Sequence, residues 1–178
     1  MVDAAKVWRI AVWGTAGAIL LAAAAASRTV AGFNWTGFDF AAAAAILGMV
    51  CLGFELATRS LIGHAPRFAA GLGLLGAFLV VWINLAVGII GAEDNRANLV
   101  FFPVLLLGAG GAIWARFQPR GMAKVMTVAA TYQVLLAAGL AGAGLPGAAM
   151  LTLGIGGLWG LSALLYHRAV RGQHAWMA

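Results

Sequence analysis

Charged side chains are scarce in this chain, with Asp, Glu, Lys and Arg making up 9% of its 178 residues. A soluble domain is about a quarter charged, so this chain has too few polar groups to cover a globule in water. Hydrophobic residues account for 63% of it, and the mean hydropathy is +0.97. The apolar runs are continuous, without the alternation of a membrane β-barrel. The predicted fold class is therefore all-α, a polytopic membrane helix bundle.

Cysteine is almost absent as well. Cys51 is the single cysteine, which excludes a disulfide within the chain and a cysteine metal cluster. It lies in an apolar run, so we expect a small buried side chain there. His64, His167 and His174 fall near one predicted membrane surface and not inside facing helices, which argues against a haem site. No catalytic motif occurs in a usable context, and no cofactor is expected.

Stretches without formal charge predict where the chain crosses the membrane. Residues 10–27, 68–92 and 97–115 are each long enough for one crossing of about 20 residues. The 43 residues from Val125 to His167 are about twice that length, and the cluster GAGLPG at 142–147 predicts a turn within them. Another span opens at Asp39 and is interrupted by Glu55.

Six transmembrane helices follow from this pattern. Their predicted bounds are near 8–26, 39–59, 68–91, 99–116, 124–142 and 148–167. The connecting loops are short, so sequential helices should be antiparallel neighbours in a single transmembrane domain over residues 1–178. The first span also imitates a signal peptide, because Lys6 and Arg9 precede an apolar stretch that ends in AAAAAS. That stretch is long for a signal peptide, and we expect a retained helix.

The basic residues are distributed very unevenly between the two predicted sides of the membrane. With six spans, nine of the eleven Lys and Arg residues fall on the side of the two termini, and Arg28 and Arg96 fall on the other. This bias over short loops predicts that both termini are cytoplasmic. Because the basic residues cap hydrophobic runs, the net charge of +6 indicates a lipid bilayer as the partner and no nucleic acid.

One predicted outer turn, GAEDNRAN at residues 91–98, concentrates polar side chains. The simpler interpretation is a water-exposed turn in which Asp94 and Asn95 form local hydrogen bonds. The alternative is a small cation site formed by Glu93, Asp94 and Asn95 together with Asp39 from the first outer loop.

Few polar residues fall within the predicted spans. Glu55 precedes Arg59 by four residues, a favourable helical spacing for an ion pair near the membrane surface. We expect Glu55 to pair with Arg59 or with another arginine at the same predicted membrane surface. Alternatively, Glu55 is a buried carboxylate that serves a proton or a cationic ligand. Asn84 and Gln133 are expected to hydrogen-bond across helices and hold them together.

Glycine spacing predicts close helix packing. Gly156 and Gly160 form a GxxxG pair in the last span, and Gly108 with Ala112 forms a similar small-residue pair. We expect the Gly156/Gly160 face to contact another helix at close backbone distance, either within the bundle or from a partner chain.

The segments WINLAVGIIGAEDNRANLVFF (82–102) and ARFQPRGMAK (115–124) carry a resemblance. They resemble a group of small proteobacterial inner-membrane proteins with a GIIG, an E-D/N-N-x-A-N turn and an ARFxPRGMA loop. NWTGFDF at 34–40 is similar to the first outer loop of that group. Arg96 departs from the pattern, which has a proline or small residue there. The resemblance implies a bacterial inner membrane and no particular activity.

Three functions remain open from the sequence. The first is a non-catalytic membrane protein: an accessory, scaffold or self-associating subunit of an inner-membrane assembly, with other membrane subunits or itself as partner. The second is a small transporter or channel with a polar route through Glu55, Asn84 and Gln133. The third is a membrane enzyme that acts on a lipid or a quinone.

Overall fold

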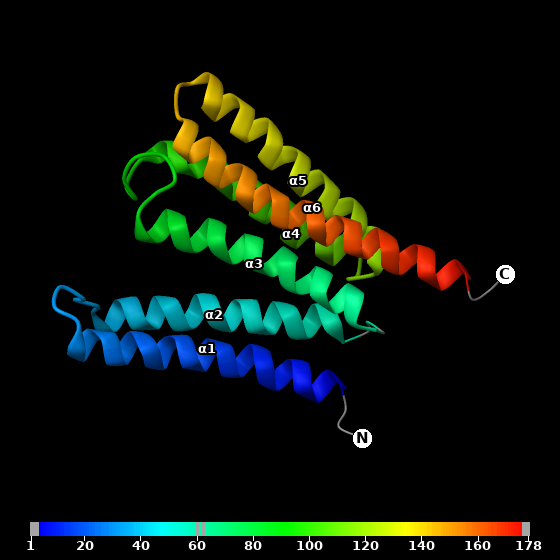
Figure 1. Cartoon of the computed structure of the whole chain (residues 1–178), viewed down its shortest axis with the longest axis horizontal. Coiled ribbons are helices and arrows are strands. Elements are labelled where there is room, and N and C mark those ends of the chain that lie inside the picture. Colours follow the sequence, from blue (N-terminus) through cyan, green and yellow to red (C-terminus); the bar gives the residue numbers. More distant parts are fainter. Residues whose placement is uncertain (1–3, 60, 62, 176–178) are drawn as a thin grey trace. The chain divides into compact units, whose positions relative to one another are not determined.

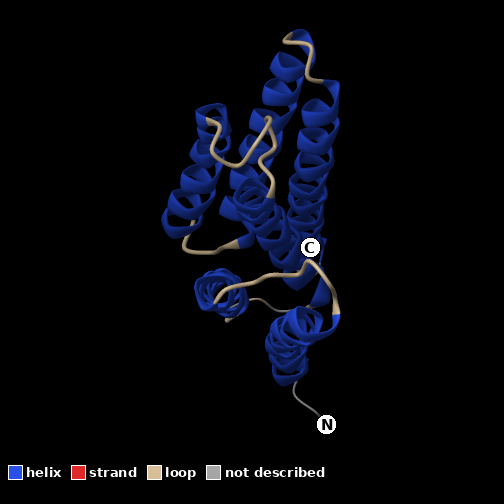
Figure 2. Cartoon of the chain, turned by 90° about the vertical axis from the view of Figure 1, so that its left-hand side faces the viewer, coloured by secondary structure: helices blue, strands red, loops and turns tan. Residues whose placement is uncertain are grey.

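The computed structural model describes residues 4–59, 61 and 63–175, and this part of the chain is helical without strands (Figures 1 and 2). The elements, in chain order, are α1 (Ala4–Thr29), α2 (Gly37–Thr58), α3 (His64–Ala86), a 3₁₀ helix η1 (Arg96–Phe101), α4 (Phe102–Trp114), α5 (Pro119–Gly142) and α6 (Pro146–Ala175). Six helical segments are long and apolar enough to cross a membrane, with η1 and α4 forming one of them. The predicted all-α bundle with six spans is confirmed.

The third predicted span was placed too late in the chain. It was expected over 68–91, but α3 runs from His64 to Ala86. Uncharged residues 87–92 are not part of a helix, because Gly88 and Gly91 adopt positive φ angles of 72° and 69°. Glycine reaches this left-handed region without steric cost, and the turn needs it twice. α6, in turn, continues eight residues beyond the predicted end at 167.

The contacts divide the chain into two compact units, Met1–Leu56 and Ala57–Ala178, and each is described by itself. The expectation of one transmembrane domain over 1–178 stays a prediction. The first unit contains α1 and most of α2, which run antiparallel. Trp8 packs on Phe54 with ring centroids 6.1 Å apart, and Sγ of Cys51 lies 3.8 Å from the carbonyl oxygen of Val12. Cys51 is buried, as expected.

The second unit is organised around α6. α5 and α6 form a hairpin closed by a turn at residues 143–145, and they lie side by side along their length (Figure 1). α6 also packs on α3, and α4 packs on α5. The buried face of α6 includes a stripe with the three- and four-residue spacing of a helix, formed by Thr152, Ile155, Trp159, Ser162 and Tyr166. Four of these five side chains carry a polar atom.

Candidate functional site

The turn between α3 and η1 is built around the side chain of Asn98. Asn98 is 4% exposed, and its Oδ1 accepts hydrogen bonds from the backbone N–H groups of Ile89 (3.1 Å) and Ile90 (2.8 Å). Its Nδ2 donates to the carbonyl oxygens of Ala92 (2.9 Å) and Ile90 (3.4 Å). A Cβ on Gly88 would lie 2.4 Å from the Ala92 oxygen, so the loop closes tightly against this amide. Sequence reasoning missed Asn98, although the repeated Gly and Asn of GIIGAEDNRAN signalled such a turn.

Asn95 also serves the turn. Its Oδ1 accepts from the backbone N–H of Ala97, and its Nδ2 donates to the carbonyl oxygen of Ile90, both at 3.0 Å. Glu93 and Asp94 are exposed beside it. The amide groups of the turn are therefore engaged in folding it, in agreement with the simpler interpretation of this segment.

Asp39, the fourth residue of the predicted cation site, has a structural partner in the first unit. Its Oδ2 accepts from both the backbone N–H and the hydroxyl of Thr36, each at 2.7 Å, and the Thr36 hydroxyl accepts from the backbone N–H of Asp39 at 3.3 Å. This reciprocal pair is a capping box at the start of α2. Within the described residues, no three His, Cys, Asp or Glu side chains are grouped so as to hold a metal ion.

Glu55 pairs with Arg9 and not with Arg59. Oε1 of Glu55 lies 3.1 Å from Nη2 of Arg9, and the two side chains are 24% and 65% exposed. The prediction named Arg59 first and another arginine at the same membrane surface second, and the second alternative is correct. The antiparallel register explains the choice, because it places Trp8 and Arg9 beside Phe54 and Glu55.

Side chains of α6 hydrogen-bond to the backbone of α3. Nε1 of Trp159 donates to the carbonyl oxygen of Gly73 at 2.8 Å, and the hydroxyl of Ser162 donates to that of Ala69 at 2.7 Å. A Cβ on Gly76 would lie 2.6 Å from Nε1 of Trp159, so the indole fits only because α3 has glycine there. In the membrane such small residues admit the neighbouring side chain. The signal in the sequence is the spacing of Ala69, Gly73 and Gly76, which places three small residues on one face of α3.

The two intramembrane amides do not bridge helices as predicted. Nδ2 of Asn84 donates to the carbonyl oxygen of Val80 in its own helix at 2.7 Å, and Oδ1 has no partner among the described residues. Gln133 is fully buried, and neither Nε2 nor Oε1 is hydrogen-bonded in the described part of the chain. The hydroxyl of Tyr166 is likewise buried without a partner.

The glycine predictions are confirmed at one position and stay predictions at the other two. A Cβ on Gly156 would lie 2.9 Å from Cβ of Gln133, which confirms a close approach of α6 to α5. A Cβ on Gly160 or Gly108 would have no atom within 4 Å, so these two glycines have no close neighbour in the described part of the chain, and a contact with a partner chain stays a prediction. On α4 the close approach is at Gly111, where a Cβ would lie 2.7 Å from a methyl group of Val125.

These features define the class as a multi-pass α-helical membrane protein whose internal polar groups hold turns and helix pairs. No protein-family model, no curated protein and no solved structure matches the chain.

Proposed function

We propose that the chain is a non-catalytic protein of the bacterial inner membrane that acts as an accessory, scaffold or self-associating subunit. The observation that supports this proposal is the structural use of its polar side chains. Asn98 and Asn95 fold a turn, Asp39 caps α2, and Trp159 and Ser162 hold α6 on α3. A protein that dedicates these groups to its own packing is suited to present a stable membrane surface.

The outward surface of α6 supports association in particular. Gly154 and Gly157 are exposed and lie three residues apart, and a Cβ on either would have no atom within 4 Å. Lipid gives helices no hydrophobic drive to associate, so small residues that let backbones approach are a common basis of helix–helix contact.

Size analysis after extraction in a mild detergent tests the proposal. We expect a protein mass above that of one chain, from further copies or from a second membrane protein. Gly157→Leu should reduce this mass, since it fills the outward surface of α6. Gly139→Leu is the matched control, because Gly139 is also open and exposed but lies on α5. A single chain alone both in detergent and after cross-linking in the membrane contradicts the proposal.

The second candidate is a small transporter, and Gln133 favours it. An amide that is buried without a hydrogen bond costs stability, which is the pattern of a group retained for function. Glu55 belongs to the first unit and is paired with Arg9, so this candidate depends on Asn84 and Gln133. Proton uptake into proteoliposomes tests it with a pH-sensitive dye. Gln133→Leu should abolish uptake and leave the melting temperature unchanged or higher. No observation favours the third hypothesis, an enzyme of lipid or quinone.

A further inference from the structure

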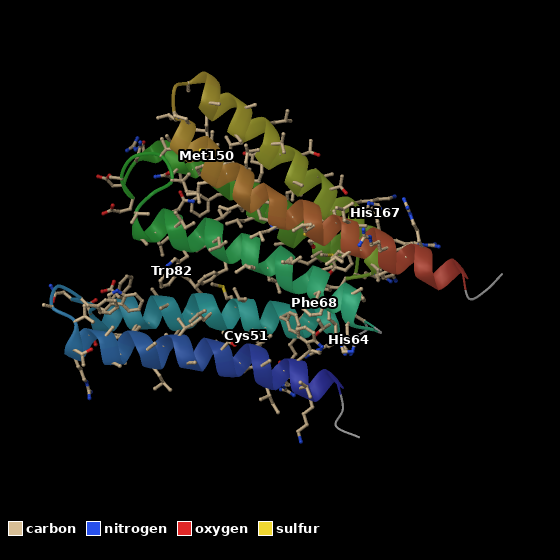
Figure 3. The ribbon with its side chains drawn as sticks, viewed as in Figure 1. Cys51, His64, Phe68, Trp82, Met150 and His167 are labelled. Carbon is tan, nitrogen blue, oxygen red and sulfur yellow. The ribbon has the colours of Figure 1, made fainter. Side chains whose placement is uncertain are left out.

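One end of the second unit carries a dense set of positive charges. We call it the basic collar, and it consists of Arg67, Arg116, Arg120, Lys124, Arg168 and Arg171. These residues come from the start of α3, from the α4–α5 loop and the start of α5, and from the end of α6. Figure 3 shows nitrogen-bearing side chains gathered at this end of α5 and α6, around His167.

The helix register places the collar residues at similar heights. α6 is antiparallel to α3, with Ser162 bonded to Ala69, so Arg67 and Arg168 lie within about 6 Å of the same height at 1.5 Å per residue. α6 is also antiparallel to α5, with Gly156 against Gln133. Lys124 and Arg168 therefore lie within about 5 Å of the same height.

The acidic side chains of this unit lie away from the collar. In residues 57–178 the acidic side chains are Glu93 and Asp94, and both lie in the turn at the opposite end of α3. The first turns of α3 and α5 contain no acidic residue, and their N-caps, Gly63 and Gln118, make no side-chain capping bond. The positive ends of two helix dipoles thus add to the charge of the collar.

The backbone of the α4–α5 loop is strained where it presents the collar. Arg116 and Phe117 have φ angles of 49° and 57°, in the left-handed region that L-residues rarely adopt. Gly121 lets the loop fold back, since a Cβ there would lie 2.5 Å from Cβ of Ala115. The strained turn leaves Arg116 exposed at the end of the unit.

Large apolar side chains flank the arginines. Trp114 is 76% exposed two residues before Arg116, and Phe68 is 53% exposed next to Arg67. Exposed aromatic rings at the level of cationic side chains match the boundary between acyl chains and headgroups. Phosphate complements the charge, and the aromatic rings complement the lipid glycerol region.

We propose that the basic collar binds the phosphate groups of anionic phospholipids. The ligand class is a phosphodiester on a diacyl lipid with a net negative charge. Arginine suits it because its guanidinium presents paired donors to phosphate oxygens. This binding would fix the end of the second unit at the headgroup layer.

Thermal unfolding in a neutral detergent tests the proposal with phosphatidylglycerol as probe. Saturating lipid should raise the melting temperature by on the order of 5 °C. The shift should fall as KCl screens the charges. Phosphatidylcholine at the same concentration should leave the melting temperature unchanged. An equal shift with phosphatidylcholine, or one that is independent of salt, would overturn the proposal.

Charge variants locate the effect. Arg67→Gln combined with Lys124→Gln and Arg168→Gln should remove most of the shift, and Arg67→Lys with Arg168→Lys should keep it. Arg96→Gln is the matched control, because Arg96 lies at the opposite end of the unit. If the neutral variant does not fold, the salt dependence of the unmodified protein decides the question.

Two further outcomes distinguish other occupants, and either one overturns the proposal. Inorganic phosphate that reproduces the full shift would make the collar a site for a free anion. If phosphatidylglycerol gives no shift, and a copurifying acidic protein is lost from the neutral variant but kept by Arg96→Gln, the collar is a protein-docking surface.

Discussion

Asn98 is the residue on which the turn between α3 and η1 depends. Asn98→Ala removes four hydrogen bonds and leaves the N–H groups of Ile89 and Ile90 without partners. Each orphaned buried group costs about 1–3 kcal/mol, so we expect the melting temperature in detergent to fall by roughly 5–10 °C. Glu93→Gln, at an exposed position of the same turn, should change it by less than about 2 °C. Equal effects of the two substitutions would show that Asn98 does not organise the turn.

Gly76 is the residue that admits the indole of Trp159. Gly76→Ala places a methyl group 2.6 Å from Nε1 of Trp159, so the ring must move and its hydrogen bond to Gly73 weakens. Overpacking of this kind costs about 1–3 kcal/mol. Gly108→Ala meets no atom within 4 Å and should leave stability unchanged or higher, because alanine favours a helix. Thermal unfolding of both variants measures the difference, and a stable Gly76→Ala protein would contradict the packing.

At the residue scale, the sequence predicted whether a side chain is buried better than it predicted which group that side chain contacts. The burial of Cys51 followed from its apolar run. The partner of Glu55 could not be predicted from the sequence, because i to i+4 spacing describes contacts within one helix. The register between α1 and α2 places Arg9 beside Glu55 instead. Gln133 was expected to bond another helix, but a lone amide in a span says nothing about which groups face it.

At the scale of elements, the two glycines of the GxxxG pair in α6 have different surroundings in the α5–α6 hairpin. Gly156→Leu should force α6 away from α5, since even a Cβ would lie 2.9 Å from Cβ of Gln133. The expected result is a lower melting temperature. Gly160→Leu meets open space and should be tolerated. Identical melting profiles for the two variants would mean that Gly156 is not at a contact.

The α1–α2 hairpin allows a charge test of its register. We expect Arg9→Gln and Glu55→Gln to be non-additive in a double-mutant cycle, with a coupling of about 0.2–1 kcal/mol, because the two side chains form an ion pair. The cycle of Arg59→Gln with Glu55→Gln is the control and should be additive. Thermal unfolding in detergent provides the measurement. Coupling in the second cycle but not in the first would restore the pairing predicted from spacing.

Helix number was predictable from charge-free runs, and helix ends were not. Length and hydropathy identify a span, yet they cannot distinguish the last turn of a helix from an apolar loop. Residues 87–91 are uncharged, but Gly88 and Gly91 turn left-handed and Asn98 bonds the backbone between them. The end of α3 is therefore fixed by a side chain ten or more residues further along the chain.

For the whole molecule, the distribution of basic residues predicts the topology. We expect Asn95→Cys to react with a membrane-impermeant thiol reagent on intact cells and Gln173→Cys to react only after the cells are opened. The reason is the bias of basic residues toward the side of the termini. Cys51→Ala provides the background, since Cys51 is 2% exposed. Labelling of Gln173→Cys alone on intact cells would reverse the orientation.

At this scale the sequence predicted the class and the span count because both depend on composition summed over many residues. The division of contacts at Leu56 and Ala57 did not follow, since it depends on which helix faces meet. The packing of α6 against both α3 and α5 could also not be predicted from residue spacing, because a stripe of small and apolar residues does not indicate which helices it contacts.

The length of α6 has a mechanical consequence. Its 30 residues extend about 45 Å, whereas the hydrocarbon core of a bilayer is about 30 Å thick. Residues 146–166 carry no charge and already match that thickness, so the nine residues from His167 to Ala175 form a stiff lever of about 13 Å beyond it. A 10° change in the tilt of the span would move the tip of this lever by about 2 Å. Any change in the tilt of α6 would therefore also displace the C-terminal end of the helix.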